Sequence, residues 1–284
     1  MKKALSMALI AALGLGMTSC LGSEDDEITR ASLQMYNFTE NLDDPKETPV
    51  LTMGNTSFEV NHTQRNINMT VQGSVMDGLP VSFSTGVLPM TATNNSYVYS
   101  AKSIMSTGIA VSSFEGAYEP NVGMVFNEYI VSGSYKVHST ASYAYNFSVM
   151  TVYDAPGGKL LYQSDKIAFG FIPACDKAMT TKMVVSGFAL SDGGDIMPTL
   201  TYETSSEKGK ETEKSLHYSM TKDGFKVEGL ATACSQGYAT YNITNVKGEV
   251  SEYGKFGKVS YSLNNGKQDY YVEIQGTMFF VPVN

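Results

Sequence analysis

The chain has 284 residues, of which 42% are hydrophobic and 17% charged, with 28 acidic against 20 basic side chains. This acidic balance repels phosphate backbones, so it argues against a nucleic-acid partner and against electrostatic docking onto anionic lipid. The chain contains no tryptophan, which is mild evidence against a carbohydrate-binding module, although its 18 tyrosines offer a similar stacking surface.

The N-terminal residues predict export through a membrane. Lys2 and Lys3 precede an uncharged apolar run over residues 4–17. At roughly 14 residues this run is shorter than the about 20 residues that a permanent membrane span requires. We therefore expect residues 1–19 to be a signal peptide that is removed from the mature protein.

The residues around Cys20 predict the means of attachment. Met17-Thr18-Ser19-Cys20 resembles a bacterial lipobox, with Met17 in the place where Leu is usual. The resemblance implies that Cys20 is lipidated and that residues 20–30 form a tether. The acidic run that follows is similar to the lipoprotein export signal of Bacteroidota, which implies a position on the outer face of the outer membrane; an ordinary solvated tether is the alternative. The run consists of Ser23, Glu24, Asp25, Asp26 and Glu27.

Residues 31–173 are predicted to form an N-terminal β-domain. The clearest strand covers residues 66–72, where Ile67, Met69 and Val71 alternate with polar residues and should face a core. Asp77-Gly78 predicts a hairpin turn directly after it. Residues 100–114 are the least strand-like, and their apolar spacing favours a short amphipathic helix.

Residues 178–284 are predicted to form a C-terminal β-domain. Seven strand candidates separated by tight turns are typical of a sandwich or a barrel. The last strand is strongly apolar on the face of Val272 and Ile274, so we expect it in the middle of a sheet. The boundary at residues 173–177 depends only on strand count, and one continuous curved sheet pair is the alternative. No short internal repeat is found.

The fold class that these patterns predict is all-β. The expected architecture is an antiparallel β-sandwich or a lipocalin-like barrel, in two β-domains. Many hairpin-linked strands, glycine turns and aromatic inward faces resemble, in pattern only, the calycin type of barrel.

Two cysteines remain if Cys20 carries lipid. An exported chain meets an oxidising compartment, so a disulfide between Cys175 and Cys234 is predicted, with two buried free thiols as the alternative. No CxxC pair occurs, which disfavours a zinc or redox site built on cysteine.

No motif identifies a catalytic, metal or cofactor site. Each of the three histidines stands alone in sequence, and GxSxG, P-loop and GxGxxG patterns are absent. Asp192 and Asp195 offer too few oxygens for calcium, so a plain turn is expected there. A hydrolase needs only two carboxylates at a set distance, which sequence cannot select; Glu115, Glu119 and Glu128 are examples of such scattered acids. We assign no catalytic residue, metal ligand or cofactor.

The function expected from these features is non-enzymatic ligand binding at the cell surface. The lipid on the N-terminus would be the membrane attachment, and the ligand a small hydrophobic molecule or a glycan. The methionines are expected mainly to fill the core, and a pocket lined by methionine and tyrosine is the more specific form of the hypothesis. A structural or adhesive role like that of fimbrillins, and an unidentified hydrolase, are the alternatives. The oligomeric state is not predicted.

Overall fold

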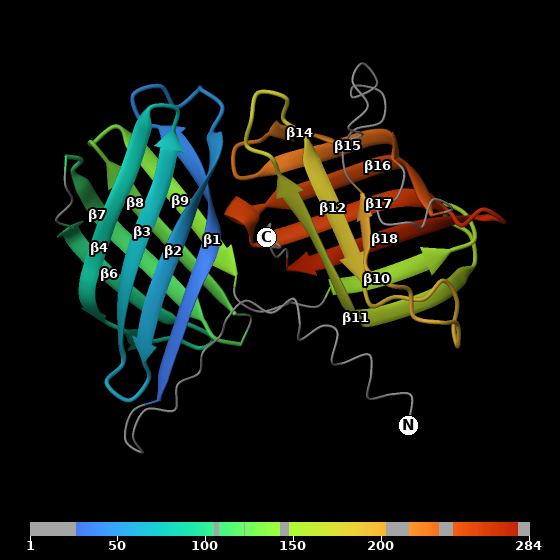
Figure 1. Cartoon of the computed structure of the whole chain (residues 1–284), viewed down its shortest axis with the longest axis horizontal. Coiled ribbons are helices and arrows are strands. Elements are labelled where there is room, and N and C mark those ends of the chain that lie inside the picture. The colour runs from blue at the N-terminus through green and yellow to red at the C-terminus, as the bar shows by residue number, and fades with distance from the viewer. Residues whose placement is uncertain are drawn as a thin grey trace.

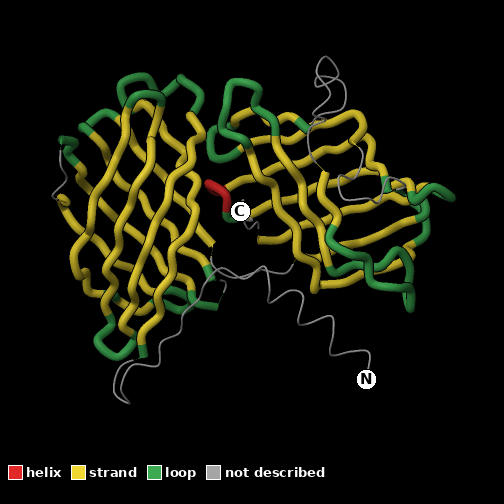
Figure 2. Tube along the Cα trace, in the orientation of Figure 1, coloured by secondary structure: helices red, strands yellow, loops and turns green. Residues whose placement is uncertain are grey.

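The protein folds into two curled antiparallel sheets of nine strands each. Figures 1 and 2 show two barrel-like bodies side by side, with almost every described residue in a strand or a tight turn. The predicted all-β fold is confirmed, and two such sheets fit two β-domains. No helix in the described part of the chain is long and apolar enough to cross a membrane. The computed structural model describes residues 27–104, 108–121, 123–142, 148–202, 216–232 and 241–277.

The first sheet is a meander in which the first strand pairs with the last. Its order is β4-β3-β2-β1-β9-β8-β7-β6-β5, and all its strand pairs are antiparallel. We call this sheet the first barrel. Its strands are β1 (Ile28–Asn41), β2 (Val50–Asn61), β3 (Asn66–Met76), β4 (Leu79–Pro89), β5 (Thr91–Ala92), β6 (Tyr97–Ile104), β7 (Val111–Glu119), β8 (Met124–Val131) and β9 (Tyr135–Ser142).

The second sheet, called the second barrel below, repeats this strand order. Its order is β13-β12-β11-β10-β18-β17-β16-β15-β14, so its first strand, β10, also pairs with its last, β18. A short 3-10 turn, η2 (Glu252–Gly254), joins β16 to β17. The strands are β10 (Ser148–Tyr153), β11 (Leu160–Pro173), β12 (Thr181–Ser186), β13 (Leu200–Tyr202), β14 (His217–Met220), β15 (Phe225–Thr232), β16 (Asn242–Ser251), β17 (Phe256–Asn264) and β18 (Asp269–Thr277).

The two barrels share their irregularities as well as their topology. The seventh strand of each carries a bulge at the same place, after Ser112 in β7 and after Thr244 in β16. Each bulge contains a left-handed residue that is not glycine, Ser113 (φ 49°) and Asn245 (φ 54°). A bulge adds an unpaired residue and bends its strand, so the same bulge in both barrels gives the same local curvature.

Counting along the ladders from these bulges aligns the two cores. Gly116 corresponds to Gly248, and each lies against an aromatic ring. A Cβ at Gly116 would overlap the ring of Tyr99, and one at Gly248 would lie 2.6 Å from the ring of Phe171. The chain therefore contains two copies of one nine-strand architecture. Other aligned residues are Phe58 with Phe171, Met69 with Met183, and Tyr129 with Tyr261.

The change from one sheet to the other lies earlier in the chain than the predicted domain boundary at residues 173–177. It falls between β9 and β10, that is, between residues 142 and 148. The strands β10 and β11 were expected in the N-terminal domain, but β10 pairs along its length with β18. Only this long-range pairing distinguishes the two sheets, and it leaves no local pattern in the sequence.

Local predictions gave mixed results. Ile67, Met69 and Val71 are buried as predicted, and β18 lies between β10 and β17 in the middle of its sheet. The predicted helix over residues 100–114 is wrong, because β6 and β7 form an antiparallel pair there. The apolar residues with helical spacing, Ala101, Ile104 and Ile109, lie at the end of β6 and before the start of β7, so their spacing belongs to no single element.

The barrels contact each other through the outer face of β1. Tyr36 and Phe38 point away from the first core and are fully buried against residues of the second core. The ring of Phe38 stacks on Phe225 with centroids 6.4 Å apart, and the hydroxyl of Tyr36 donates to the carbonyl oxygen of Pro173 at 3.5 Å. This junction positions the site described next.

Candidate functional site

A groove of about 670 Å³ crosses the outer face of β6, β7, β8 and β9 in the first barrel. Its far end is closed by residues 252–255 of the second barrel, which we call the hairpin tip. The volume lies within the range of small-molecule sites, which is roughly 300–1,000 Å³. The interior of this barrel, by contrast, is filled with stacked and edge-on rings, among them Phe83, Phe114 and Tyr129.

Two rows of neighbouring side chains form the floor of the groove. The apolar row runs through Val98, Ala117 and Phe126 on successive strands. The polar row runs beside it and brings Glu115 directly opposite Glu128 across β7 and β8. Like charges in directly opposite positions destabilise a sheet, so this pair costs stability and requires an explanation. The complete polar row is Ser100, Glu115, Glu128 and His138.

The same face of the second barrel has the opposite character. The strands β15 to β18, with β10, enclose a hollow of about 610 Å³ there. Opposite charges face each other across its strands, because Lys226 and Lys258 flank Glu249, and Lys258 Nζ lies 2.6 Å from Glu249 Oε2. Glu228 likewise faces Lys247. Such a ladder is balanced within itself and is typical of a solvated sheet face.

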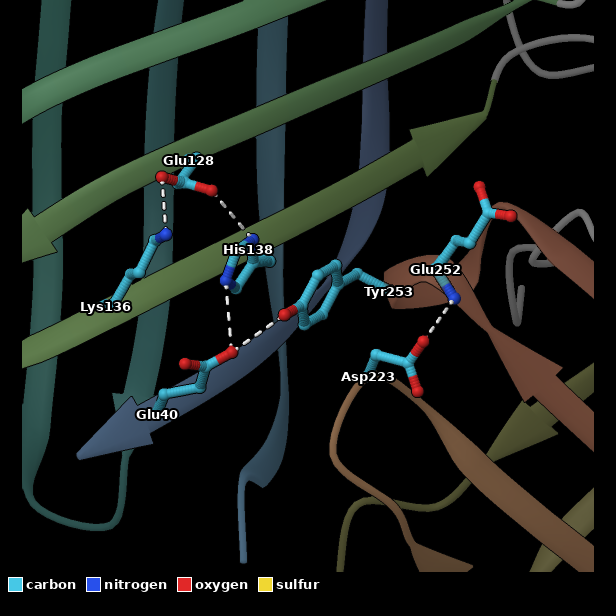
Figure 3. A network of polar contacts seen from close by, with 7 residues as sticks. All are labelled: Glu40, Glu128, Lys136, His138, Asp223, Glu252 and Tyr253. Carbon is cyan, nitrogen blue, oxygen red and sulfur yellow. Dashed lines mark hydrogen bonds and ion pairs between the residues drawn. The ribbon is translucent and has the colours of Figure 1, made fainter. Parts of the chain in front are cut away.

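A polar network links the first barrel to the hairpin tip (Figure 3). The two carboxylate oxygens of Glu128 contact Lys136 Nζ at 2.8 Å and His138 Nδ1 at 3.2 Å. The other ring nitrogen of His138, Nε2, lies 3.3 Å from Glu40 Oε1, outside hydrogen-bond geometry. The hydroxyl of Tyr253 donates to the same Glu40 oxygen at 2.9 Å. His138 therefore lies between two carboxylates, one on each side of its ring.

Tyr253 anchors the hairpin tip on the first barrel. Its ring stacks on His138 with centroids 3.6 Å apart and an angle of 4° between the planes, and it meets Phe38 edge-on. The hydroxyl of Thr140 donates to the carbonyl oxygen of Tyr253. These contacts hold one wall of the groove in place.

The backbone of the hairpin tip is held in a left-handed conformation. Glu252 and Tyr253 have φ angles of 51° and 54°, which for residues other than glycine cost about 1–3 kcal/mol each. Asp223 stabilises this turn, because its carbonyl oxygen accepts from the Tyr253 amide at 2.6 Å and its carboxylate accepts from the Glu252 amide at 3.4 Å. The turn places Lys255 Nζ 4.1 Å from the centre of the Phe126 ring.

Burial decides the charge of His138. His138 is among the buried polar residues, at 8% exposure, and desolvation lowers its pKa below the ordinary value. Glu128 and Glu40 act in the opposite direction and Lys136 adds to the lowering, with a lowered pKa as the net result. His138 is thus neutral at pH 7. Burial, together with the hydrogen bond to Glu40, raises the pKa of Tyr253.

The residues predicted for lipidation and disulfide formation lie mostly outside the described part of the chain. Cys20, residues 23–26 and Cys234 are not among the described residues. Glu27 is described, and its carbonyl oxygen accepts from the His62 amide at 2.9 Å. Cys175 is a partly buried thiol whose pKa is raised to about 12 by burial and by Asp176. The bridge between Cys175 and Cys234 stays a prediction.

The sequence identified the acidic residues and the histidine as candidates but did not show which of them lie together in space. Glu115 and Glu128 line the groove together, whereas Glu119 does not line it. Asp192 and Asp195 are exposed at a turn, with Gly193 at φ 74°. No group of three or more His, Cys, Asp or Glu side chains in the described ranges is arranged to hold a metal ion. Tyr253 and Lys255 were missed, since no sequence signal joins them to residues of the first barrel.

Fold and groove together define a β-protein of two similar barrels with a ligand-sized groove on the outside of the first. No protein-family model and no curated protein matches the sequence.

Two solved structures show a distant similarity to the chain. A presumed outer membrane protein from Bacteroides fragilis is 12% identical, with a TM-score of 0.35, and the match covers 87% of this chain and 96% of that one. The isotype 1 transferrin-binding protein B of Neisseria meningitidis serogroup B is 8% identical, with a TM-score of 0.24, over 87% of this chain and 76% of that one. Similarity at this level defines neither a family nor a function.

Proposed function

We propose that the protein is a lipid-anchored surface lipoprotein that binds a small molecule or a short stretch of glycan without converting it. The N-terminal residues support the location, because Cys20 follows an apolar run too short to span a membrane and precedes an acidic run. The groove on the first barrel supports the binding.

One observation carries the binding proposal. The two barrels present the same face, and only the first has an apolar row beside two directly opposed carboxylates. A locally unfavourable arrangement that the sister barrel avoids is typical of a functional site rather than of a solvated surface. The hairpin tip adds a wall, which makes the face concave.

Binding without conversion agrees with the state of Glu128. Both of its oxygens are engaged, one by Lys136 and one by His138. A catalytic acid or base must exchange a proton with its substrate, and a carboxylate fixed by two partners suits a static charge better. Glu115 and Glu128 are nevertheless the pair to test for hydrolysis, because they are neighbours on one face of the sheet.

The binding test compares two matched variants on an array of defined glycans and small molecules. Ala117→Trp fills the groove of the first barrel, and Glu249→Trp makes the equivalent change on the second barrel. We expect the wild type and Glu249→Trp to retain the same compounds and Ala117→Trp to lose them. Mass spectrometry should recover each retained compound unchanged. Retention by all three proteins, or cleaved products that disappear in Glu115→Gln, would refute binding without conversion in this groove.

The anchor is tested separately in cells. Cys20→Ala should release soluble protein, because the acyl chains are the expected attachment. Replacing Glu24, Asp25, Asp26 and Glu27 by Ala should leave the protein lipidated but protected from external protease. Unchanged surface labelling of that variant would show that the acidic run is not needed for export to the outer face.

A further inference from the structure

The polar row of the groove contains one carboxylate without a partner. Glu128 is paired with Lys136, but Glu115 has no ion pair or hydrogen bond within the part of the chain that the structure describes. His138, which lies one strand beyond Glu128 in the row, is neutral and does not compensate it. A second negative charge directly opposite Glu128 therefore remains open to the groove.

The apolar row beside it already holds one cation of the protein itself. Lys255 Nζ lies over the ring of Phe126, the geometry in which an ammonium group is attracted by an aromatic face. Val98, at the other end of the row, is 39% exposed. The floor thus combines an open carboxylate, exposed aliphatic surface and a ring that binds an ammonium group.

The second barrel shows that this combination is not a general property of the sheet. Where the first barrel has Val98, Ala117 and Phe126, the second has Lys226, Glu249 and Lys258. Glu249, the carboxylate of that row, has a lysine directly opposite on each side. Glu273, which also lines the second hollow, faces Ser260 and Thr151, but it lies beside this charged row and not beside an apolar one.

From these observations we infer that the groove selects ligands carrying an organic ammonium group, held by Glu115 beside Glu128 with the attached carbon skeleton on Ala117 and Phe126. This inference rests on the proposed binding function and specifies its ligand class. A metal ion is a poor alternative, since calcium takes six to eight oxygens and two carboxylates do not supply them.

Two pairs of probes test the inference. Within each pair a charged probe is compared with a neutral one of similar shape, and the two pairs compare an alkyl amine with an amino sugar. n-Butylammonium is compared with n-butanol, and glucosamine with N-acetylglucosamine, at pH 6.5 and constant ionic strength. Binding to the mature chain with Cys20→Ala is followed by NMR chemical shifts. We expect at least one ammonium probe to bind about fivefold or more tightly than its neutral partner, as for a charge-assisted contact. The pair that shows the difference identifies the source as an alkyl amine or an amino sugar.

Glu115→Gln and Glu249→Gln make the same change on the two barrels. We expect Glu115→Gln to abolish the preference for the ammonium probe and Glu249→Gln to keep it. If charged and neutral probes bind with equal affinity, and Ala117→Trp binds neither, the ammonium inference is overturned and the proposed binding function stands. An equal loss of the ammonium preference in both Gln variants would attribute it to general surface charge and would overturn the inference. A failure of every probe to bind would overturn it as well. In either case the proposed binding function is tested separately, by the array of glycans and small molecules with Ala117→Trp and Glu249→Trp.

Discussion

At the scale of single residues, His138 shows how a buried group is kept neutral beside two carboxylates. The residue is buried, its ring is stacked on Tyr253, and Lys136 adds a positive charge nearby. Desolvation therefore outweighs Glu40 and Glu128 and lowers the pKa of His138. A neutral imidazole also adds no positive charge to the polar row, so Glu115 stays uncompensated, which the ammonium inference requires.

The lowered pKa of His138 predicts a pH dependence of stability. In the unfolded chain the histidine has its ordinary pKa of about 6.5, so on acidification from about pH 7.5 to 5 the unfolded state binds the proton first. The free energy of unfolding should fall over this range, and the fall should be smaller in His138→Gln. Lys136→Met should raise the pKa of His138 in an NMR titration. The same pH slope in wild type and His138→Gln would show that the imidazole is not desolvated.

At the scale of elements, the bulged strands β7 and β16 control the shape of both barrels. Each carries a glycine three residues beyond the left-handed position, and in each the missing side chain makes room for an aromatic ring. The ring of Tyr99 cannot retreat easily, because it is stacked on Phe114 with centroids 6.2 Å apart and its hydroxyl donates to Asn127.

Adding a methyl group at these glycines should destabilise both barrels. Gly116→Ala and Gly248→Ala each force a Cβ into a ring, for which overpacking costs about 1–3 kcal/mol. Urea unfolding should show a lower midpoint for either variant. Ser100→Ala, an exposed position on the neighbouring strand β6, serves as the control and should be close to neutral. Glycine variants as stable as this control would contradict the aligned packing of the two barrels.

At the scale of the whole molecule, two similar barrels associate through surfaces that differ. In the first barrel the outer face of β1 carries Tyr36 and Phe38, which are buried by the second barrel. The equivalent positions on β10 are Val149 and Thr151, and Val149 is 37% exposed. Head-to-tail contacts between similar units propagate unless one unit lacks the complementary surface. The loss of the aromatic pair on β10 is consistent with an association that ends after two barrels.

Replacing Phe38 of the first barrel by threonine, the residue at the equivalent position 151 of the second, should weaken this association. Phe38→Thr removes a ring that contacts both Phe225 and Tyr253, and loss of a buried aromatic side chain costs about 3–5 kcal/mol. We expect urea unfolding to lose cooperativity and the two barrels to unfold in separate steps. Thr151→Phe, the reverse change on β10, should leave the stability of the monomer nearly unchanged. A single unaltered transition in Phe38→Thr would show that the junction contributes little.

Local features of the fold could be predicted from the sequence, and long-range ones could not. The alternation of Ile67, Met69 and Val71 is a property of one strand, as is the Asp77-Gly78 turn, and both were found. The pairing of β10 with β18 depends on residues far apart in the chain, so the sheet boundary was placed too late. The apolar residues Ala101, Ile104 and Ile109 had helical spacing only because they fall across the end of β6 and the connection to β7.

The candidate site could not be predicted from the sequence either, because it too depends on long-range contacts. Its floor comes from four strands, and its wall from a turn in the other barrel. In the sequence, His138 is a lone histidine, and Glu115 and Glu128 are ordinary acidic residues. Only the strand register places the two carboxylates opposite each other, and only the packing of the barrels brings Tyr253 and Lys255 to them.

The most direct test is a crystal structure of the mature chain soaked with n-butylammonium. The ligand nitrogen is predicted within hydrogen-bond distance of Glu115, and its alkyl chain is predicted on Ala117 and Phe126. The equivalent face around Glu249 should be empty of ligand. Density for the probe on the second barrel, or inside either barrel, would contradict the assignment of the groove as the binding site.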